Sequence, residues 1–445
     1  MRSSVRRTMM TVGVALGLGL WSGTGNAYAP HEVACRVDLD RSVLPADATT
    51  RVIVKITLDA PVTERHERLP VNLGVVLDRS GSMGGEKIAK AREAAIEALR
   101  RLNGSDLFSV VIYDHEVETL VPAQAAGNTE WIENRIRGIE ARGNTALFGG
   151  VSQGAAEVRR NADRKYVSRI ILLSDGLANV GPSTPDDLAR LGAALRKEGI
   201  SVSTVGVGTD YNEDLMTQLA QKSDGNTYFV ESSRDLPRIF AAELGDVLSV
   251  AARDVQVEIE FAGRPLRVIG REGRIRDNRV ELDLSQLYGG QSKYVLVEVE
   301  VPSTAAGKEK DIASVRCQYR DTVREKTLLV TAHGTARFSA DAAAVERSVS
   351  SAVSRDVVLN EAAEARDRAI ALNDAGRNKD AAAELTLQAT RLREMGYKYK
   401  MDDLVKEGIK LEGRAKAAEA APMSSVDRKG LRTESFQTRN QQIAQ

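Results

Sequence analysis

The sequence predicts an α/β domain, built on a Rossmann-like doubly wound parallel sheet, that is inserted in a β-sandwich and followed by a C-terminal helical region. Three observations support this fold class. Between 70 and 249, short uninterrupted apolar runs alternate with amphipathic helical segments, the pattern of parallel strands covered by helices on both faces. The segments on either side alternate apolar and polar residues, as half-buried antiparallel strands do. Beyond 339, apolar residues recur at helical spacing.

The chain begins with the features of a secretory signal. Arg2, Arg6 and Arg7 precede an apolar stretch, and small residues follow it up to Ala27. The apolar stretch is shorter than the ~20 residues that span a bilayer, and no later segment approaches that length. We therefore expect residues 1–27 to be a signal peptide. The mature protein is expected to be exported, periplasmic or extracellular, and to have no transmembrane segment.

The expected β-sandwich is divided in the sequence. Residues 28–69 supply its N-terminal strands, with apolar residues at alternate positions from Val52 to Leu58. Residues 250–338 alternate in the same way and complete it. The simplest explanation is a single sandwich with the α/β domain, residues 70–249, inserted between its strands. The expected strands of that domain are Val71–Leu77, Phe108–Tyr113, Arg169–Ser174, Ile200–Val207 and Thr227–Val230.

The C-terminal part divides into a helical region and a tail. Residues 339–418 are expected to form a helical hairpin region, because small and apolar residues recur at helical spacing, for example from Ala362 to Leu372. Residues 419–445 are polar with little periodicity. We expect them to form a tail that stays flexible until it binds a partner.

Charge and cysteine content narrow the class of protein. The chain has 62 basic residues (Lys plus Arg) and 62 acidic residues (Asp plus Glu), and aromatic residues make up only 4% of it. This balance gives no reason to expect nucleic acid as a partner. Cys35 and Cys317 each lie on the apolar side of an alternating segment. Two interpretations stay open: a pair of buried thiols, or a disulfide formed in an oxidising compartment.

Oxygen-bearing side chains cluster where strands of the α/β domain end. Asp78, Ser80 and Ser82 follow the first apolar run, and their spacing allows three side chains to point to one side of a loop. Asp175 follows another apolar run, and Thr145 lies between them in the sequence. Ligand sites in such sheets lie beyond the carboxyl ends of strands. Carboxylate and hydroxyl oxygens suit Mg²⁺, with Mn²⁺ or Ca²⁺ as alternatives.

These residues resemble a known site. Asp78-x-Ser80-x-Ser82, with Thr145 in Gly-Asn-Thr and Asp175 in Ser-Asp-Gly, is similar to the metal-ion-dependent adhesion site of von Willebrand factor type A (VWA) domains. The resemblance implies that the three hydroxyls bind magnesium directly and that the two carboxylates act mainly through water. The whole layout also resembles bacterial exported proteins similar to inter-alpha-trypsin inhibitor heavy chains and to calcium-activated chloride channel homologues.

The candidate residues lack the motifs of common enzyme classes. The sequence contains no Gly-x-x-x-x-Gly-Lys-Ser/Thr phosphate loop and no His-Glu-x-x-His zinc motif, and no Gly-x-Ser-x-Gly elbow surrounds Ser80 or Ser174. We therefore expect a protein that is not an enzyme. It is predicted to be an exported, magnesium-dependent adhesion or scaffolding protein that captures an acidic side chain of a protein partner. An accessory or regulatory subunit of an envelope transport or channel complex is the first alternative, and a metal-dependent hydrolase is the second.

Overall fold

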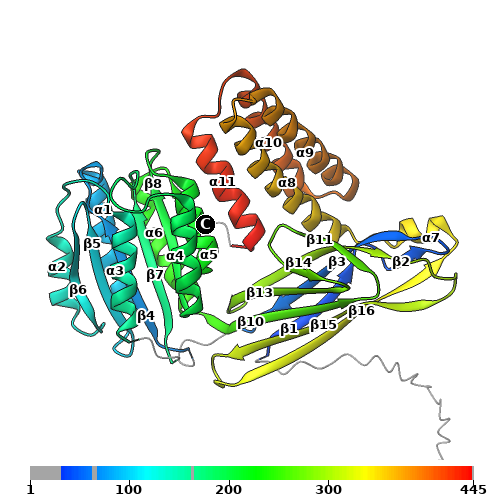
Figure 1. Cartoon of the computed structure of the whole chain (residues 1–445), viewed down its shortest axis with the longest axis horizontal. Coiled ribbons are helices and arrows are strands. Elements are labelled where there is room, and N and C mark those ends of the chain that lie inside the picture. Colours follow the sequence, from blue (N-terminus) through cyan, green and yellow to red (C-terminus); the bar gives the residue numbers. More distant parts are fainter. Residues whose placement is uncertain (1–31, 63–67, 162–164, 443–445) are drawn as a thin grey trace, which may run out of the picture.

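The computed structural model describes residues 32–62, 68–161 and 165–442. The predicted signal peptide, residues 1–27, lies outside these ranges. Figure 1 shows three parts: an α/β domain, a β-sandwich, and a helical region whose last helix lies between the other two. This arrangement confirms the predicted fold class.

The α/β domain is built on a sheet with the strand order β6-β5-β4-β7-β8-β9. Its strands are β4 (Val71–Asp78), β5 (Leu107–Tyr113), β6 (Val117–Ala125), β7 (Val167–Ser174), β8 (Ile200–Val207) and β9 (Thr227–Val230). Neighbouring strands are parallel except β5 and β6. Every residue of β4, β7 and β8 is buried, which explains their uninterrupted apolar runs.

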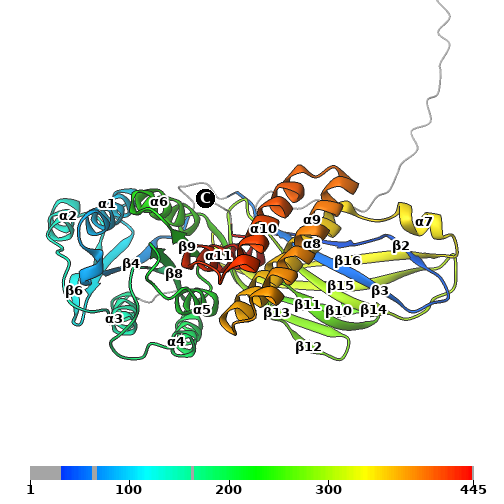
Figure 2. The same cartoon turned by 90° about the horizontal axis from the view of Figure 1, so that it is seen from above.

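Helices cover both faces of this sheet, as the view from above shows (Figure 2). One face carries α1 (Glu86–Arg101), α2 (Thr129–Arg137) and α6 (Leu236–Val247), and the other carries α3 (Leu147–Arg159), α4 (Pro185–Lys197) and α5 (Glu213–Ser223). Strand β6 was not among the expected strands. It is an antiparallel edge strand with exposed ends and an internal proline, Pro122, so neither an apolar run nor clean alternation marks it.

The β-sandwich consists of a sheet in the order β1-β3-β14-β11 and a sheet in the order β12-β13-β10-β15-β16-β2. The strands before the α/β domain are β1 (Ala34–Leu39), β2 (Val43–Pro45) and β3 (Thr50–Asp59). Those after it are β10 (Val250–Phe261), β11 (Arg264–Ile269), β12 (Arg274–Arg276), β13 (Arg279–Tyr288), β14 (Ser292–Val301), β15 (Glu309–Asp321) and β16 (Thr327–Ser339). Strand β3 pairs with β14 along its whole length, so the α/β domain interrupts a continuous sandwich.

The two cysteines lie in the core of this sandwich. Cys35 is in β1 and Cys317 is in β15, which belong to opposite sheets. Burial is the main cause that raises the pKa of each thiol to about 12, and the neighbouring Cys35 contributes to the shift at Cys317. No disulfide joins Cys35 to Cys317 in the structure. The disulfide therefore stays a prediction, with two buried thiols as the alternative.

The helical region contains α7 (Ala342–Arg347), α8 (Ser351–Asp374), α9 (Asn378–Tyr399), α10 (Asp402–Ala420) and α11 (Ser425–Asn440). The expectation of a flexible tail over 419–445 is wrong for most of that segment, since α11 fills it. Leu431 and Phe436 are buried. The rest of its buried side is polar: Arg428 pairs with Glu213 of α5 and with Asp374 of α8. Such long-range pairing leaves no periodic apolar signal in the sequence.

Within the described ranges, no helix is long and apolar enough to span a membrane.

Candidate metal site

The candidate site lies beyond the carboxyl ends of β4 and β7, two adjacent parallel strands in the middle of the sheet. Asp78 is the last residue of β4, and Asp175 directly follows β7. Ser80 and Ser82 lie in the loop and short 3₁₀ turn after β4. Because parallel strands end at the same edge, residues far apart in the chain meet here.

Four of the five predicted oxygen ligands are joined by hydrogen bonds. The hydroxyl oxygens of Ser80 and Ser82 lie 3.1 Å apart. The Ser82 hydroxyl donates to Asp175 Oδ1 over 2.7 Å. Asp78 Oδ1 accepts the backbone N–H of Ser80 over 2.8 Å, and Asp78 Oδ2 accepts the hydroxyl of Ser174 over 2.7 Å. The carboxylates are therefore held in fixed orientations by the loop itself.

Gly176 shows that the fifth residue, Thr145, joins them. A Cβ atom at Gly176 would lie 3.3 Å from Ser82 Oγ, 3.4 Å from Thr145 Oγ1 and 4.0 Å from Ser80 Oγ. Three hydroxyl oxygens thus surround the space that a side chain at position 176 would enter. The structure brings together all five residues that the sequence singled out.

The loop after β7 positions Thr145 through contacts that the sequence did not predict. Its backbone N–H donates to Asn179 Oδ1 over 2.9 Å, and its carbonyl accepts N–H groups from the loop after β7. On the other side, the Arg142 N–H donates to the Arg79 carbonyl over 2.6 Å. Asp114 Oδ2 pairs with both arginines over 2.9 Å. Asp114 therefore supports the Thr145 loop, and its charge is balanced by guanidinium groups.

The charges of the two site carboxylates are balanced unequally. Asp78 and Asp175 are both fully buried. Lys87, on α1, donates to Asp175 Oδ2 over 2.5 Å. Among the described residues, no basic side chain forms an ion pair with Asp78. Burial raises the pKa of Asp78 to about 6, despite the hydrogen bonds from Ser80 and Ser174 that lower it.

These features fit a small, hard cation. Hydroxyl and carboxylate oxygens are the ligands that such ions take, and a buried carboxylate without a protein cation gains most from one. Ser82 is exposed, unlike Asp78, Ser80 and Asp175, so the site is open to solvent on that side. The arrangement can therefore hold an ion and leave it accessible from outside.

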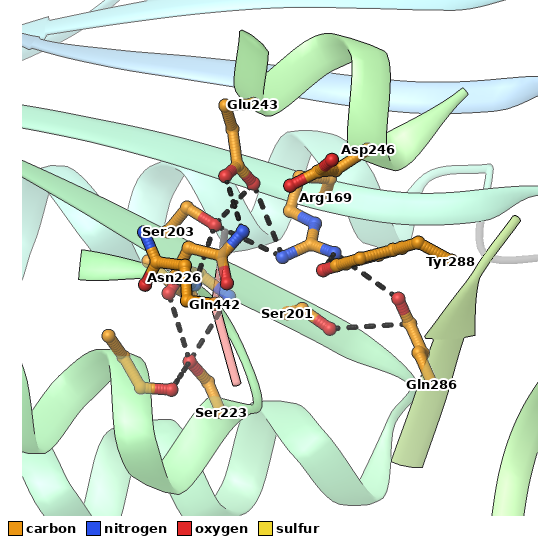
Figure 3. Close-up of polar contacts among 12 residues, drawn as sticks. Arg169, Ser201, Ser203, Ser223, Asn226, Glu243, Asp246, Gln286, Tyr288 and Gln442 are labelled. Atoms are coloured by element: carbon orange, nitrogen blue, oxygen red, sulfur yellow. Dashed lines mark hydrogen bonds and ion pairs between the residues drawn. The ribbon is translucent and has the colours of Figure 1, made fainter. Parts of the chain in front are cut away.

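A second polar cluster lies toward the opposite end of the strands, at the junction with the sandwich (Figure 3). Arg169 of β7 is fully buried, and its guanidinium donates to Ser203 Oγ over 3.0 Å and to Tyr288 Oη of β13 over 2.8 Å. It lies 3.4 Å from Glu243 Oε1 of α6. Glu243 in turn accepts hydrogen bonds from Ser203, Asn226 and Tyr228.

Gln442 closes the same junction. The side-chain amide of Gln442 accepts the N–H of Thr227 and donates to its carbonyl, both over 3.2 Å. Thr227 begins the edge strand β9, so this amide occupies the place of a neighbouring strand. Glu243 thus has a cation beside it and three donors, and the cluster joins the two domains.

Comparisons with known proteins agree with this architecture. Residues 72–242 match the family model of the von Willebrand factor type A domain. The chain is 25% identical over 313 residues to the uncharacterized protein sll0103 of Synechocystis sp., covering 66% of this chain and 74% of that protein. It is 26% identical over 235 residues to human inter-alpha-trypsin inhibitor heavy chain H4, covering 51% of this chain but only 24% of that protein.

Two solved structures resemble most of the chain. The von Willebrand factor type A protein from Catenulispora acidiphila has a TM-score of 0.68 at 19% identity and covers 84% of this chain and 88% of that one. The ArnB paralog VWA2 from Sulfolobus acidocaldarius has a TM-score of 0.61 at 19% identity, with coverage of 92% and 98%. At this identity the likeness shows a shared fold, and it extends well beyond the α/β domain.

Proposed function

Since residues 72–242 form a von Willebrand factor type A domain, we propose that this chain is a magnesium-dependent protein of the adhesion or scaffolding kind. It captures an acidic side chain of a protein partner at the site around Asp78. Mn²⁺ or Ca²⁺ can take the place of magnesium. The role is binding without turnover, and the protein acts after export, in the periplasm or outside the cell.

The observation that carries the proposal is the unbalanced charge of Asp78 beside three converging hydroxyl groups. Ser80, Ser82 and Thr145 would hold the ion through neutral oxygens, and Asp78 and Asp175 would supply the negative charge that retains it. A hard ion with few anionic ligands keeps a strong affinity for one more anionic oxygen. The exposed side at Ser82 is where a partner's carboxylate would approach.

Metal binding is tested by titration calorimetry of the purified mature chain with Mg²⁺ and Mn²⁺. We expect one ion per chain, with affinity reduced at least about tenfold by Thr145→Ala, since one ligand oxygen is lost. Thr129→Ala removes the same group from an exposed position on α2 and is the matched control. Absence of heat in the wild-type protein would contradict the proposal.

Partner capture is tested separately. Immobilised wild-type protein is exposed to an envelope extract with magnesium or with a chelator, beside Asp78→Ala and Thr129→Ala. We expect the same partners on wild type and on Thr129→Ala with magnesium, and their loss with the chelator and on Asp78→Ala. Equal recovery in every sample would exclude capture through a metal. If the wild-type protein hydrolysed a substrate and Asp78→Ala did not, the site would be catalytic and the binding proposal would be wrong.

A further inference from the structure

A cavity of about 290 Å³ lies where the three parts of the molecule meet. Helix α5 of the α/β domain forms one wall, the turn after β11 of the sandwich forms another, and α8 and α11 close it. Figure 2 shows α11 lying between α5 and the sandwich. The polar side chains that line the cavity include Gln218, Gln221, Arg271, Asp367, Arg432 and Arg439.

Two of these guanidinium groups are held side by side. Arg271 Nη2 donates to the carbonyl of Arg439 over 3.0 Å, and Arg439 Nε donates to the carbonyl of Gly270 over 2.6 Å. Gly270 has a φ of +78°, and a side chain there would overlap Asn360, so glycine is required for this turn. Each guanidinium thus donates to a backbone carbonyl of the other arginine's segment. These hydrogen bonds hold together two cations that would otherwise repel each other.

The carboxylates that line the cavity form ion pairs with only some of its arginines. Asp367 pairs with Arg432 over 2.5 Å and with Arg439 over 2.8 Å, and Asp214 of α5 pairs with Arg432 over 2.8 Å. Arg271 forms no ion pair with any carboxylate of the described residues; its partners are the Arg439 carbonyl and Gln441 Oε1.

The electrostatics of the cavity and an unpartnered donor in it also favour an anionic ligand. Burial and the neighbouring Arg439 charge lower the pKa of Arg271 to about 10, against the opposite effects of Tyr294 and Asp224. The Nε of Arg432 is buried and has no hydrogen-bond partner. A buried donor without an acceptor is costly, and an oxygen atom from a ligand would remove that cost.

We propose that this cavity binds a small oxyanion of the phosphate type, with Arg271 as its main contact and Arg432, Arg439 and Gln221 around it. Guanidinium groups bind such anions through paired N–H donors. Because the walls come from all three parts of the chain, the anion stabilises their assembled arrangement. The site is separate from the one around Asp78.

The test is calorimetric titration of the full mature chain with inorganic phosphate at constant ionic strength set by sodium chloride. We expect saturable binding of one phosphate, at least about tenfold weaker in Arg271→Gln because one charged contact is lost. Arg276→Gln removes the same charge from an exposed position in the nearby strand β12 and should keep wild-type affinity. No saturable binding, or equal affinity in Arg271→Gln, overturns the proposal.

A second variant covers the case in which Arg271→Gln fails to fold. Gln221→Glu places a carboxylate in the cavity wall, where it supplies Arg271 with an anion of its own. We expect this variant to unfold at a temperature no lower than wild type without phosphate, and to lose both phosphate binding and the rise in unfolding temperature that phosphate causes. Retention of wild-type phosphate affinity in Gln221→Glu would place the anion elsewhere.

Discussion

At the scale of single residues, the candidate site depends on what position 176 lacks. The hydroxyls of Ser80, Ser82 and Thr145 point into space that a methyl group at Gly176 would enter. Asp78 lies at the same sheet edge without a basic partner among the described residues. The proposed ion would therefore occupy the space left by the absent side chain of Gly176, and its charge would balance that of Asp78.

Gly176→Ala tests this directly. The added methyl would touch Thr145 Oγ1 at 3.4 Å and lie only 3.3 Å from Ser82 Oγ, so the Ser82 hydroxyl would have to shift by a few tenths of an ångström. We expect magnesium affinity to fall about tenfold or more, corresponding to ~1.4 kcal/mol, with the unfolding temperature of the metal-free protein nearly unchanged. Calorimetric titration measures it. Gly127→Ala, whose methyl would meet nothing within 4 Å, is the control; an unchanged affinity in Gly176→Ala would show that the ion lies elsewhere.

The main oxygen-bearing residues could be predicted because their signal is local. Asp78, Ser80 and Ser82 occupy alternate positions directly after an apolar run, and Asp175 follows another. Lys87, Gly176 and Asn179 could not, since each acquires its role from a neighbour distant in the chain: Lys87 from Asp175, for example. Short motifs locate ligands, and tertiary contacts decide which charges are balanced.

At the scale of helices and strands, predictability follows how each element is buried. Strands β4, β7 and β8 are buried on both faces and were expected from their apolar runs. Strand β6 lies at an edge and was missed. Helix α11 was expected to be flexible, because its buried side consists largely of polar groups such as Lys429, which donates to Glu213 over 2.6 Å.

Helix α11 should therefore contribute to stability. Leu431 is fully buried, and Leu431→Ala should lower the free energy of unfolding by about 2–4 kcal/mol through lost burial and a cavity. Val426 lies on the same helix with 38% of its surface exposed, and Val426→Ala should cost less than about 1 kcal/mol. Urea unfolding measures both. Equal, small changes in the free energy of unfolding in both variants would instead support a flexible tail over 419–445.

The opposite sheets of the sandwich approach each other near the cysteines. The N–H of Val33 donates to Tyr319 Oη over 3.1 Å, and each of these residues is two positions from a cysteine, Cys35 or Cys317. On the proposed export to an oxidising compartment, we expect a thiol-oxidising catalyst to remove two electrons and two protons and leave a disulfide. Thiol labelling of the denatured, unreduced protein should then detect no thiol; detection of two thiols per chain would show that the bond is absent.

At the scale of the whole molecule, the α/β domain and the sandwich are joined by buried polar groups. Asp246 lies beside Glu243, Arg169 and Lys293 at this junction. Burial, followed by the charge of Glu243, raises the pKa of Asp246 to about 7, while Arg169 and Lys293 act in the opposite direction. The folded protein therefore keeps a proton here that the unfolded chain releases near 3.8.

This difference makes stability depend on pH. Between 3.8 and about 7, the folded state binds more protons at Asp246 than the unfolded chain does, so the free energy of unfolding falls as pH rises. The loss contributed by this site is on the order of 4 kcal/mol. Urea unfolding at several pH values should show a flatter profile for Asp246→Asn. Asp235→Asn, an exposed change preceding the same helix, should keep the wild-type slope; identical slopes in all three proteins would exclude the effect.

The insertion of the α/β domain has a mechanical consequence. The chain enters the domain at the start of β4 and leaves it after α6, both at the end of the sheet remote from Asp78. A bound partner that pulls on the Asp78 edge therefore loads two covalent crossings in parallel, one leading to β3 and one to β10. Such a force would reach both halves of a single sandwich, one through β3 and the other through β10.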